Sequence, residues 1–219
     1  MKYVPRLALL IFGMLTATTH SQSYNFEGRD VQLGLGYQST RGTANMFDGA
    51  SGAAAVSNAT MGSLATTLGA SYTTALSNQI TLGAIFESSP LKLKAGSASV
   101  SPPAPYTVNA YDETFKNVYN LSLVPGYAID KSRLAYAKLG YTYAAAIFTS
   151  NDGSADSSAK LNGYNLGLGM RVDTGNFYPF AELNYIKFLN LTNAMADTTG
   201  RITQGGSGYN LLAGVGYHF

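Results

Sequence analysis

In this chain of 219 residues, four charged side chains have the residue types and the spacing that a functional site could use. Glu87, Lys138, Arg171 and Glu182 each lie on the polar side of a segment in which apolar and polar residues alternate. If these polar sides face a common interior, opposite charges are expected to pair, because an unpaired charge at low dielectric is unfavourable. Such a lumen charge cluster would either brace the interior or form an ion-selective constriction.

The spacing of the cluster favours Lys138 as the partner of Glu182. A turn at Thr174-Gly175 would place Arg171 opposite Tyr178 in an antiparallel hairpin. Arg171 and Glu182 would then be separated by roughly 13 Å along the strands, at ~3.3 Å per residue. Only fully extended side chains would meet over that distance, so the sequence predicts an ion pair between Lys138 and Glu182.

The segments that carry these charges belong to a pattern that recurs eight times. Apolar or aromatic residues occupy every second position, which is the period of a strand with one apolar face. The connections alternate in length, short at 74–79, 130–133 and 173–176, and long at 41–61, 88–115, 146–160 and 189–206. The eight segments are 31–37, 64–72, 80–86, 119–127, 135–143, 164–172, 177–185 and 209–219.

This pattern predicts an all-β fold, a closed, eight-stranded antiparallel up-and-down transmembrane β-barrel. The short connections are expected to be periplasmic turns and the long ones external loops. A soluble barrel would carry many charges on its outer face, but only 12% of the residues are charged and the polar side is mainly Gly, Asn, Gln and Thr. Lipid is therefore expected to cover the apolar side, and the first and last strands to pair so that no edge remains.

The N-terminus predicts a cleaved signal peptide at residues 1–23, which leaves residues 24–219 as the outer-membrane barrel domain. Lys2 and Arg6 precede the nine residues 7–15, too few to span a bilayer, and small residues allow cleavage after Ser21 or Ser23.

The composition of the mature chain excludes several kinds of site. Removal of residues 1–23 leaves 12 Lys and Arg against 12 Asp and Glu. That balance gives no indication of a nucleic-acid partner. The absence of Cys excludes disulfides, thiolate metal sites and a lipid-modified Cys.

The whole mature chain resembles the small eight-stranded outer-membrane barrels of the OmpA/OmpX type. The resemblance rests on Gly-Tyr pairs such as Gly36-Tyr37 and Gly216-Tyr217, on the stretch LSLVPGYAIDKSRLAYAKLGYTYA, and on the aromatic C-terminus. It implies an integral protein of the outer membrane of a Gram-negative bacterium, in contact with outer-membrane lipid and lipopolysaccharide. In that family the alternating C-terminal residues resemble the signal read by the outer-membrane assembly machinery, here Tyr209, Leu211, Ala213, Val215, Tyr217 and Phe219.

No constellation in the sequence predicts catalysis, a cofactor or a metal ion, so the chain is expected not to be an enzyme. Barrels that deacylate or transfer acyl chains resemble Ser/His hydrolases with a histidine near the outer leaflet. His218 lies one residue from the C-terminus, at the expected periplasmic end, with no Ser beside it. Asp152 and Asp156 share a loop, but their spacing is not that of an EF-hand.

Two functions remain open. The first is a structural and surface-interaction role through four long external loops, which could present a binding surface to a ligand. The second is a narrow, porin-like pore, because ten inward glycines could either relieve crowding or leave a water-filled path in a barrel just wide enough for side chains to fill. These glycines are Gly34, Gly36, Gly69, Gly83, Gly126, Gly140, Gly167, Gly169, Gly214 and Gly216.

Overall fold

The computed structural model describes residues 26–48, 52–58, 60–101, 109–150, 157–194 and 201–219. The predicted signal peptide lies outside these residues. None of the described segments is a helix that is long and apolar enough to cross a membrane. The strands are β1 (Gly28–Asp48), β2 (Gly52–Asn58), β3 (Thr60–Ala75), β4 (Ile80–Ser89), β5 (Leu93–Ser101), β6 (Asn109–Ala128), β7 (Arg133–Ser150), β8 (Ser157–Val172), β9 (Phe177–Ala194) and β10 (Arg201–His218).

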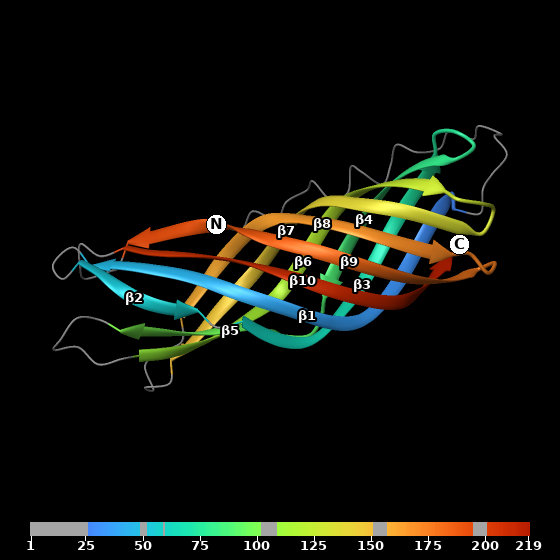
Figure 1. Cartoon of the computed structure of the whole chain (residues 1–219). Helices are drawn as coiled ribbons and strands as arrows, with labels where there is room; N and C mark the ends of the chain where they lie inside the picture. The colour runs from blue at the N-terminus through green and yellow to red at the C-terminus, as the bar shows by residue number, and fades with distance from the viewer. Residues whose placement is uncertain (1–25, 49–51, 59, 102–108, 151–156, 195–200) are drawn as a thin grey trace, which may run out of the picture.

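Eight of these strands form the predicted closed antiparallel barrel (Figure 1). The order around the wall is β1, β3, β4, β6, β7, β8, β9 and β10, so neighbours in the chain are neighbours in the barrel. The last strand pairs with the first along most of its length, from Asp30 opposite His218 to Phe47 opposite Arg201. Closure therefore satisfies the backbone groups that an open sheet edge would leave unpaired.

The outward face carries the apolar half of each alternation. On β1 the side chains of Val31, Leu33, Leu35 and Tyr37 are between 44% and 61% exposed, while Gln32 and Gln38, at alternate positions of the same strand, are buried. A continuous exposed apolar surface of this kind is what lipid covers, and it confirms which side of each strand faces outward.

Two girdles of aromatic residues bound this apolar, lipid-facing band. The outer girdle contains Tyr37, Tyr119, Tyr141, Tyr164, Tyr185 and Tyr209, and the inner one contains Tyr127, Phe177, Tyr217 and Phe219.

The four long connections are different from the prediction, because most of their described residues are strand and not loop. β1 has 21 residues, about twice the 9–11 that a tilted strand needs to cross a bilayer. The strands therefore continue as a barrel extension beyond the outer girdle. Their apolar alternation stops there because water can solvate the outward face, although the backbone ladder continues.

The extension also has eight strands, but β2 and β5 take the places that β3 and β4 occupy in the rest of the barrel. β1 pairs with β3 as far as Arg41 and then with β2 from Met46, whereas β6 pairs with β4 as far as Val118 and then with β5 from Phe115. β2 and β5 pair with each other and so fill the wall between β1 and β6. Figure 1 shows both short strands at the end of the barrel opposite the C-terminus.

Candidate functional site in the barrel lumen

The centre of the lumen is occupied by a triad of one cation and two carboxylates. Lys138 Nζ on β7 lies 2.7 Å from Glu87 Oε1 on β4 and 2.9 Å from Glu182 Oε2 on β9. All three residues are 2% exposed. The ion pair predicted between Lys138 and Glu182 is therefore present, and Glu87 makes it a three-residue brace across the lumen.

Neutral donors add hydrogen bonds to both carboxylates. Tyr136 donates its hydroxyl to Glu182 Oε1 at 2.8 Å, and the Asn184 amide donates to Glu182 Oε2 at 3.1 Å. The Gln32 amide donates to Glu87 Oε1 at 3.3 Å. A buried carboxylate with several donors is held in one geometry, so this arrangement is suited to bracing the barrel.

Two glycines on β8 leave space for the side chains of β7 that contact Glu182 on β9. Lys138 lies opposite Gly167, and Glu182 lies opposite Gly169, so two positions without side chains separate β7 from β9 on the lumen side. A Cβ at Gly169 would lie 2.5 Å from the Tyr136 ring, and one at Gly167 would lie 3.3 Å from Lys138 Cβ. The missing side chains are thus the space through which Tyr136 and Lys138 reach Glu182.

The fourth predicted charge, Arg171, does not join the triad. Its Nη1 lies 3.2 Å from Asp30 Oδ2, and its Nη2 donates to the Phe26 carbonyl at 2.9 Å. The guanidinium also lies over two aromatic rings, 5.1 Å from the centroid of Phe26 and 4.7 Å from that of Tyr178. Asp30 Oδ1 is 2.8 Å from His218 Nδ1. Together these five residues form a mouth cluster at the end of the lumen where the short turns lie.

The registration expected for the last short turn was wrong by two residues. Arg171 pairs with Phe180 and not with Tyr178, because the turn residues are Gly175 and Asn176. Thr174 donates its N–H to the Phe177 carbonyl at 3.0 Å and closes the hairpin. Gly175 has φ +105°, a conformation that favours glycine at the first position of a two-residue turn.

The outer end of the lumen is filled by apolar side chains. The rings of Phe115 and Phe188 meet edge to face with centroids 5.0 Å apart. Around them lies an outer apolar cluster of buried side chains, at the opposite end of the lumen from the mouth cluster. Its buried members are Leu93, Phe115, Val118, Ala144, Ala146, Leu161, Ile186 and Phe188.

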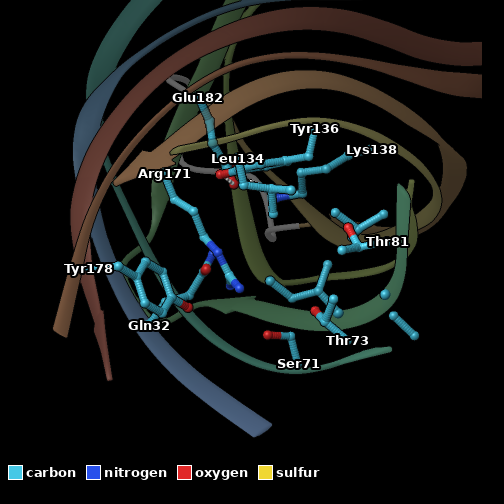
Figure 2. Close-up of a pocket in the computed structure, with 14 residues that line it drawn as sticks. Gln32, Ser71, Thr73, Thr81, Leu134, Tyr136, Lys138, Arg171, Tyr178 and Glu182 are labelled. Carbon is cyan, nitrogen blue, oxygen red and sulfur yellow. Dashed lines mark hydrogen bonds and ion pairs between the residues drawn. The ribbon is translucent and has the colours of Figure 1, made fainter. Parts of the chain in front are cut away.

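Two small cavities remain between these layers. The larger one, about 30 Å³, lies between the triad and the mouth cluster and is lined by residues that include Thr81, Tyr136, Arg171 and Tyr178 (Figure 2). The smaller one, about 10 Å³, lies against the outer apolar cluster. A water molecule needs about 10–15 Å³ of such volume, so these two cavities have room for a few waters.

Several inward glycines leave room for side chains of the neighbouring strand. A Cβ at Gly34 would lie 2.6 Å from Thr67 Oγ1, and one at Gly214 would lie 2.6 Å from the Phe180 ring. At Gly216 it would meet the Tyr178 ring. Side chains on one strand thus fill the space that glycine leaves at the paired position of the neighbouring strand, as expected for a narrow barrel with a packed interior.

Two titratable groups outside the lipid-facing band have shifted pKa values. Burial inside the extension raises the pKa of Glu113 to about 7, and its carboxylate lies where a Cβ on Gly42 would sit. In the turn between β6 and β7, the hydrogen-bonded Arg133 guanidinium holds the pKa of Asp130 well below its usual range. Near neutral pH, Glu113 is therefore partly protonated while Asp130 is fully charged.

The C-terminal strand places its six predicted signal residues on the lipid side. Tyr209, Leu211 and Val215 are 60%, 62% and 48% exposed, and Phe219 at the chain end is 72% exposed. Phe219 donates its N–H to the Arg29 carbonyl at 3.0 Å, which ties the last residue to β1. Its ring lies 5.0 Å from that of Tyr217 in the inner girdle. The placement is as expected, and the role in assembly remains a prediction.

Metal binding finds no support within the described part of the chain, where no three His, Asp or Glu side chains gather around a common point. Asp152 and Asp156 lie outside the described residues. His218, the histidine considered for catalysis, contacts Asp30 in the mouth cluster. Asp30 was missing from the predicted site. It lies two positions before Gln32 on the same strand, so the alternation of inward and outward side chains could have revealed that it faces the lumen.

Comparison with known proteins supports the fold and no finer statement. No family model and no curated protein matches the sequence. The outer membrane protease OmpT from Escherichia coli aligns over 92% of this chain and 100% of its own, at 12% identity and a TM-score of 0.54. The outer membrane protein OprG from Pseudomonas aeruginosa aligns over 90% of this chain and 99% of its own, at 12% identity and a TM-score of 0.53.

The closed wall, the lipid-facing band and these likenesses define the chain as an eight-stranded β-barrel of the outer-membrane type. At 12% identity the likeness is one of fold alone. The proteolytic activity named for OmpT is a property of that protein.

Proposed function

We propose that this protein is an integral outer-membrane barrel with a structural and surface-interaction role, exerted through the extension that projects beyond the outer girdle. The observation that carries the proposal is that buried side chains gather in the lumen at three levels: the outer apolar cluster, the triad around Lys138, and the mouth cluster around Arg171. A lumen braced in this way favours a rigid scaffold over transport.

The extension supplies the surface for such a role. It is a continuation of the barrel wall, so it presents external residues on a fixed frame. Its strands reach Asp48 on β1, Asn109 on β6 and Ala194 on β9, each well beyond the tyrosines of the outer girdle. The proposed partners are lipid and lipopolysaccharide around the barrel, the assembly machinery during insertion, and a surface ligand bound by the extension.

Conductance in planar bilayers tests the closed lumen. The purified full chain is expected to leave the current at the level of the protein-free bilayer, because the described cavities hold only a few waters. A general porin inserted into the same membrane provides the positive control. Stepwise openings with reproducible unit conductance would favour the alternative, a narrow pore for small solutes.

Orientation is tested by labelling single cysteines in intact cells, since the chain has no Cys of its own. Lys160→Cys, exposed on β8 beyond the outer girdle, is expected to react with a membrane-impermeant maleimide. Lys131→Cys, exposed in the turn between β6 and β7, is the matched control and is expected to react only after the cells are broken. The reverse pattern would invert the topology and refute the surface role.

A further inference from the structure

Two rows of basic side chains cross the outer surface of the barrel at the start of the extension. In the first row Arg41 on β1 lies opposite Ser207 on β10, and Ser207 lies opposite Lys187 on β9. Each row thus has a cation, a small residue and a cation on three adjacent strands. The second row contains Lys116 on β6, Ala145 on β7 and Lys160 on β8.

All four cations point away from the lumen. Arg41 and Lys160 are exposed, and Lys116 and Lys187 are partly exposed. Their neighbours along each strand, such as Thr40 and Phe188, are buried inside the barrel. The two rows therefore face the surroundings of the barrel and not its interior.

A row of tyrosines lies directly beneath each row of cations. Two residues toward the membrane from Lys187 and Ser207 are Tyr185 and Tyr209, whose ring centroids are 4.9 Å apart. Beneath the second row Tyr119 pairs with Tyr143, with centroids 6.3 Å apart. Interfacial tyrosines mark the depth of the lipid headgroups, so the cations are at the level of the outer-leaflet headgroups.

The small central residue leaves space for an anion between the two cations. Strands in a sheet are ~4.8 Å apart, so the backbones that carry Arg41 and Lys187 are separated by roughly 10 Å across Ser207. Two long basic side chains can converge over a distance of that size. Ala145 provides the same gap between Lys116 and Lys160.

The protein itself supplies little negative charge to these rows. In the part of the chain that the structure describes, none of the four cations is within ion-pair distance of a carboxylate, whereas Arg133 at the periplasmic end is paired with Asp130. Cations that stand among headgroups and pair with no carboxylate of the described residues are complementary to an anionic lipid.

We propose that each row binds a phosphate of the outer-leaflet glycolipid, the lipid A part of lipopolysaccharide, with the two cations converging on one phosphate above Ser207 or Ala145. The tyrosines beneath contact the acyl chains and sugar of the same lipid. This inference rests on the proposed function in one respect, the orientation that places the extension outside the cell, which the cysteine labelling tests separately. It does not depend on whether the lumen conducts or the extension binds a surface ligand.

Binding of lipid A by the purified full chain in detergent micelles tests the proposal, with native mass spectrometry as the readout. The probes are lipid A with both phosphates and the same lipid after removal of both. The row variants are Arg41→Gln with Lys187→Gln, and Lys116→Gln with Lys160→Gln. The matched control, Arg29→Gln with Lys131→Gln, removes two exposed cations at the periplasmic end.

Each row variant is expected to weaken binding of phosphorylated lipid A roughly 25-fold, at roughly fivefold per cation. The control pair is expected to stay within about twofold, and wild type is expected to lose its preference when the phosphates are removed. Circular dichroism verifies the fold of each variant, and Lys116→Arg with Lys160→Arg should retain binding. Equal binding of both lipids, unchanged binding by the row variants, or an equal loss in the control would each overturn the proposal.

Discussion

Replacing Lys138 by Met is expected to lower the free energy of unfolding by about 3–5 kcal/mol, because it removes one partner from a buried ion pair. The change takes away the cation that both Glu87 and Glu182 contact, while Met retains most of the side-chain length. Tyr136 and Gln32 would still donate to the carboxylates but could not balance their charge. Urea unfolding of the barrel in lipid vesicles measures the effect.

Two controls separate the brace from a general effect of charge. Lys131→Met, at an exposed position in a turn, is expected to change stability by less than about 0.5 kcal/mol. The triple variant Glu87→Gln, Lys138→Met and Glu182→Gln is expected to recover most of the loss, because removing all the buried charges together is far less destabilising than removing one. A wild-type unfolding midpoint for Lys138→Met alone would refute the bracing role.

Deleting Phe219 is expected to reduce the amount of barrel in the outer membrane of cells severalfold, while the purified variant still refolds in detergent. The alternating lipid-side residues of β10 end on this ring, and an intact terminal strand is what the assembly machinery is proposed to read. In the folded barrel, Phe219 contributes one ring to a girdle of many, so its loss removes only part of the interfacial anchoring. Membrane fractionation and refolding assays measure the two effects separately.

Phe177→Ala is the matched control for this deletion. Phe177 belongs to the same girdle, is 55% exposed and lies 5.1 Å from Tyr217, but it is on β9 and away from the C-terminus. It is expected to leave membrane levels near those of wild type. Equal losses in the two variants would assign Phe219 a role in anchoring alone, and failure of the Phe219 deletion to refold would make that role structural.

The embedded half of the fold was predictable because lipid on one side and packed polar groups on the other impose a strict two-residue period. The ion pair between Lys138 and Glu182 was predicted from that period and from a hairpin register that placed Arg171 four residues away from Glu182. The pair is present, but that register was wrong, because Arg171 lies opposite Phe180, two residues from Glu182. The outer strands were not predictable in this way, since residues such as Thr43 and Asn45 continue β1 where no apolar face is required.

The mouth cluster shows which parts of a site the two-residue period does not reveal. Phe26 precedes β1, so the alternation of inward and outward side chains in a strand does not apply to it. It is nevertheless fully buried beneath the Arg171 guanidinium. Asp30 sits beside Arg29 in a stretch that resembles a solvated strand end. The shift in register at Gly175 came from a choice between two adjacent turn positions, which depends on a backbone angle and not on hydrophobicity.

The exchange between β4 and β5 allows the two halves of the wall to vary in length independently. Ser89 ends one strand and Leu93 begins the other, and Pro90 between them has no N–H to donate to a ladder. A residue gained or lost at this joint would change the reach of the extension while Phe86 kept its lipid-side position. The same change within the continuous β7 would turn every later side chain to the opposite face. The joint therefore gives the exposed part of the molecule freedom to diverge without altering how the protein sits in its membrane.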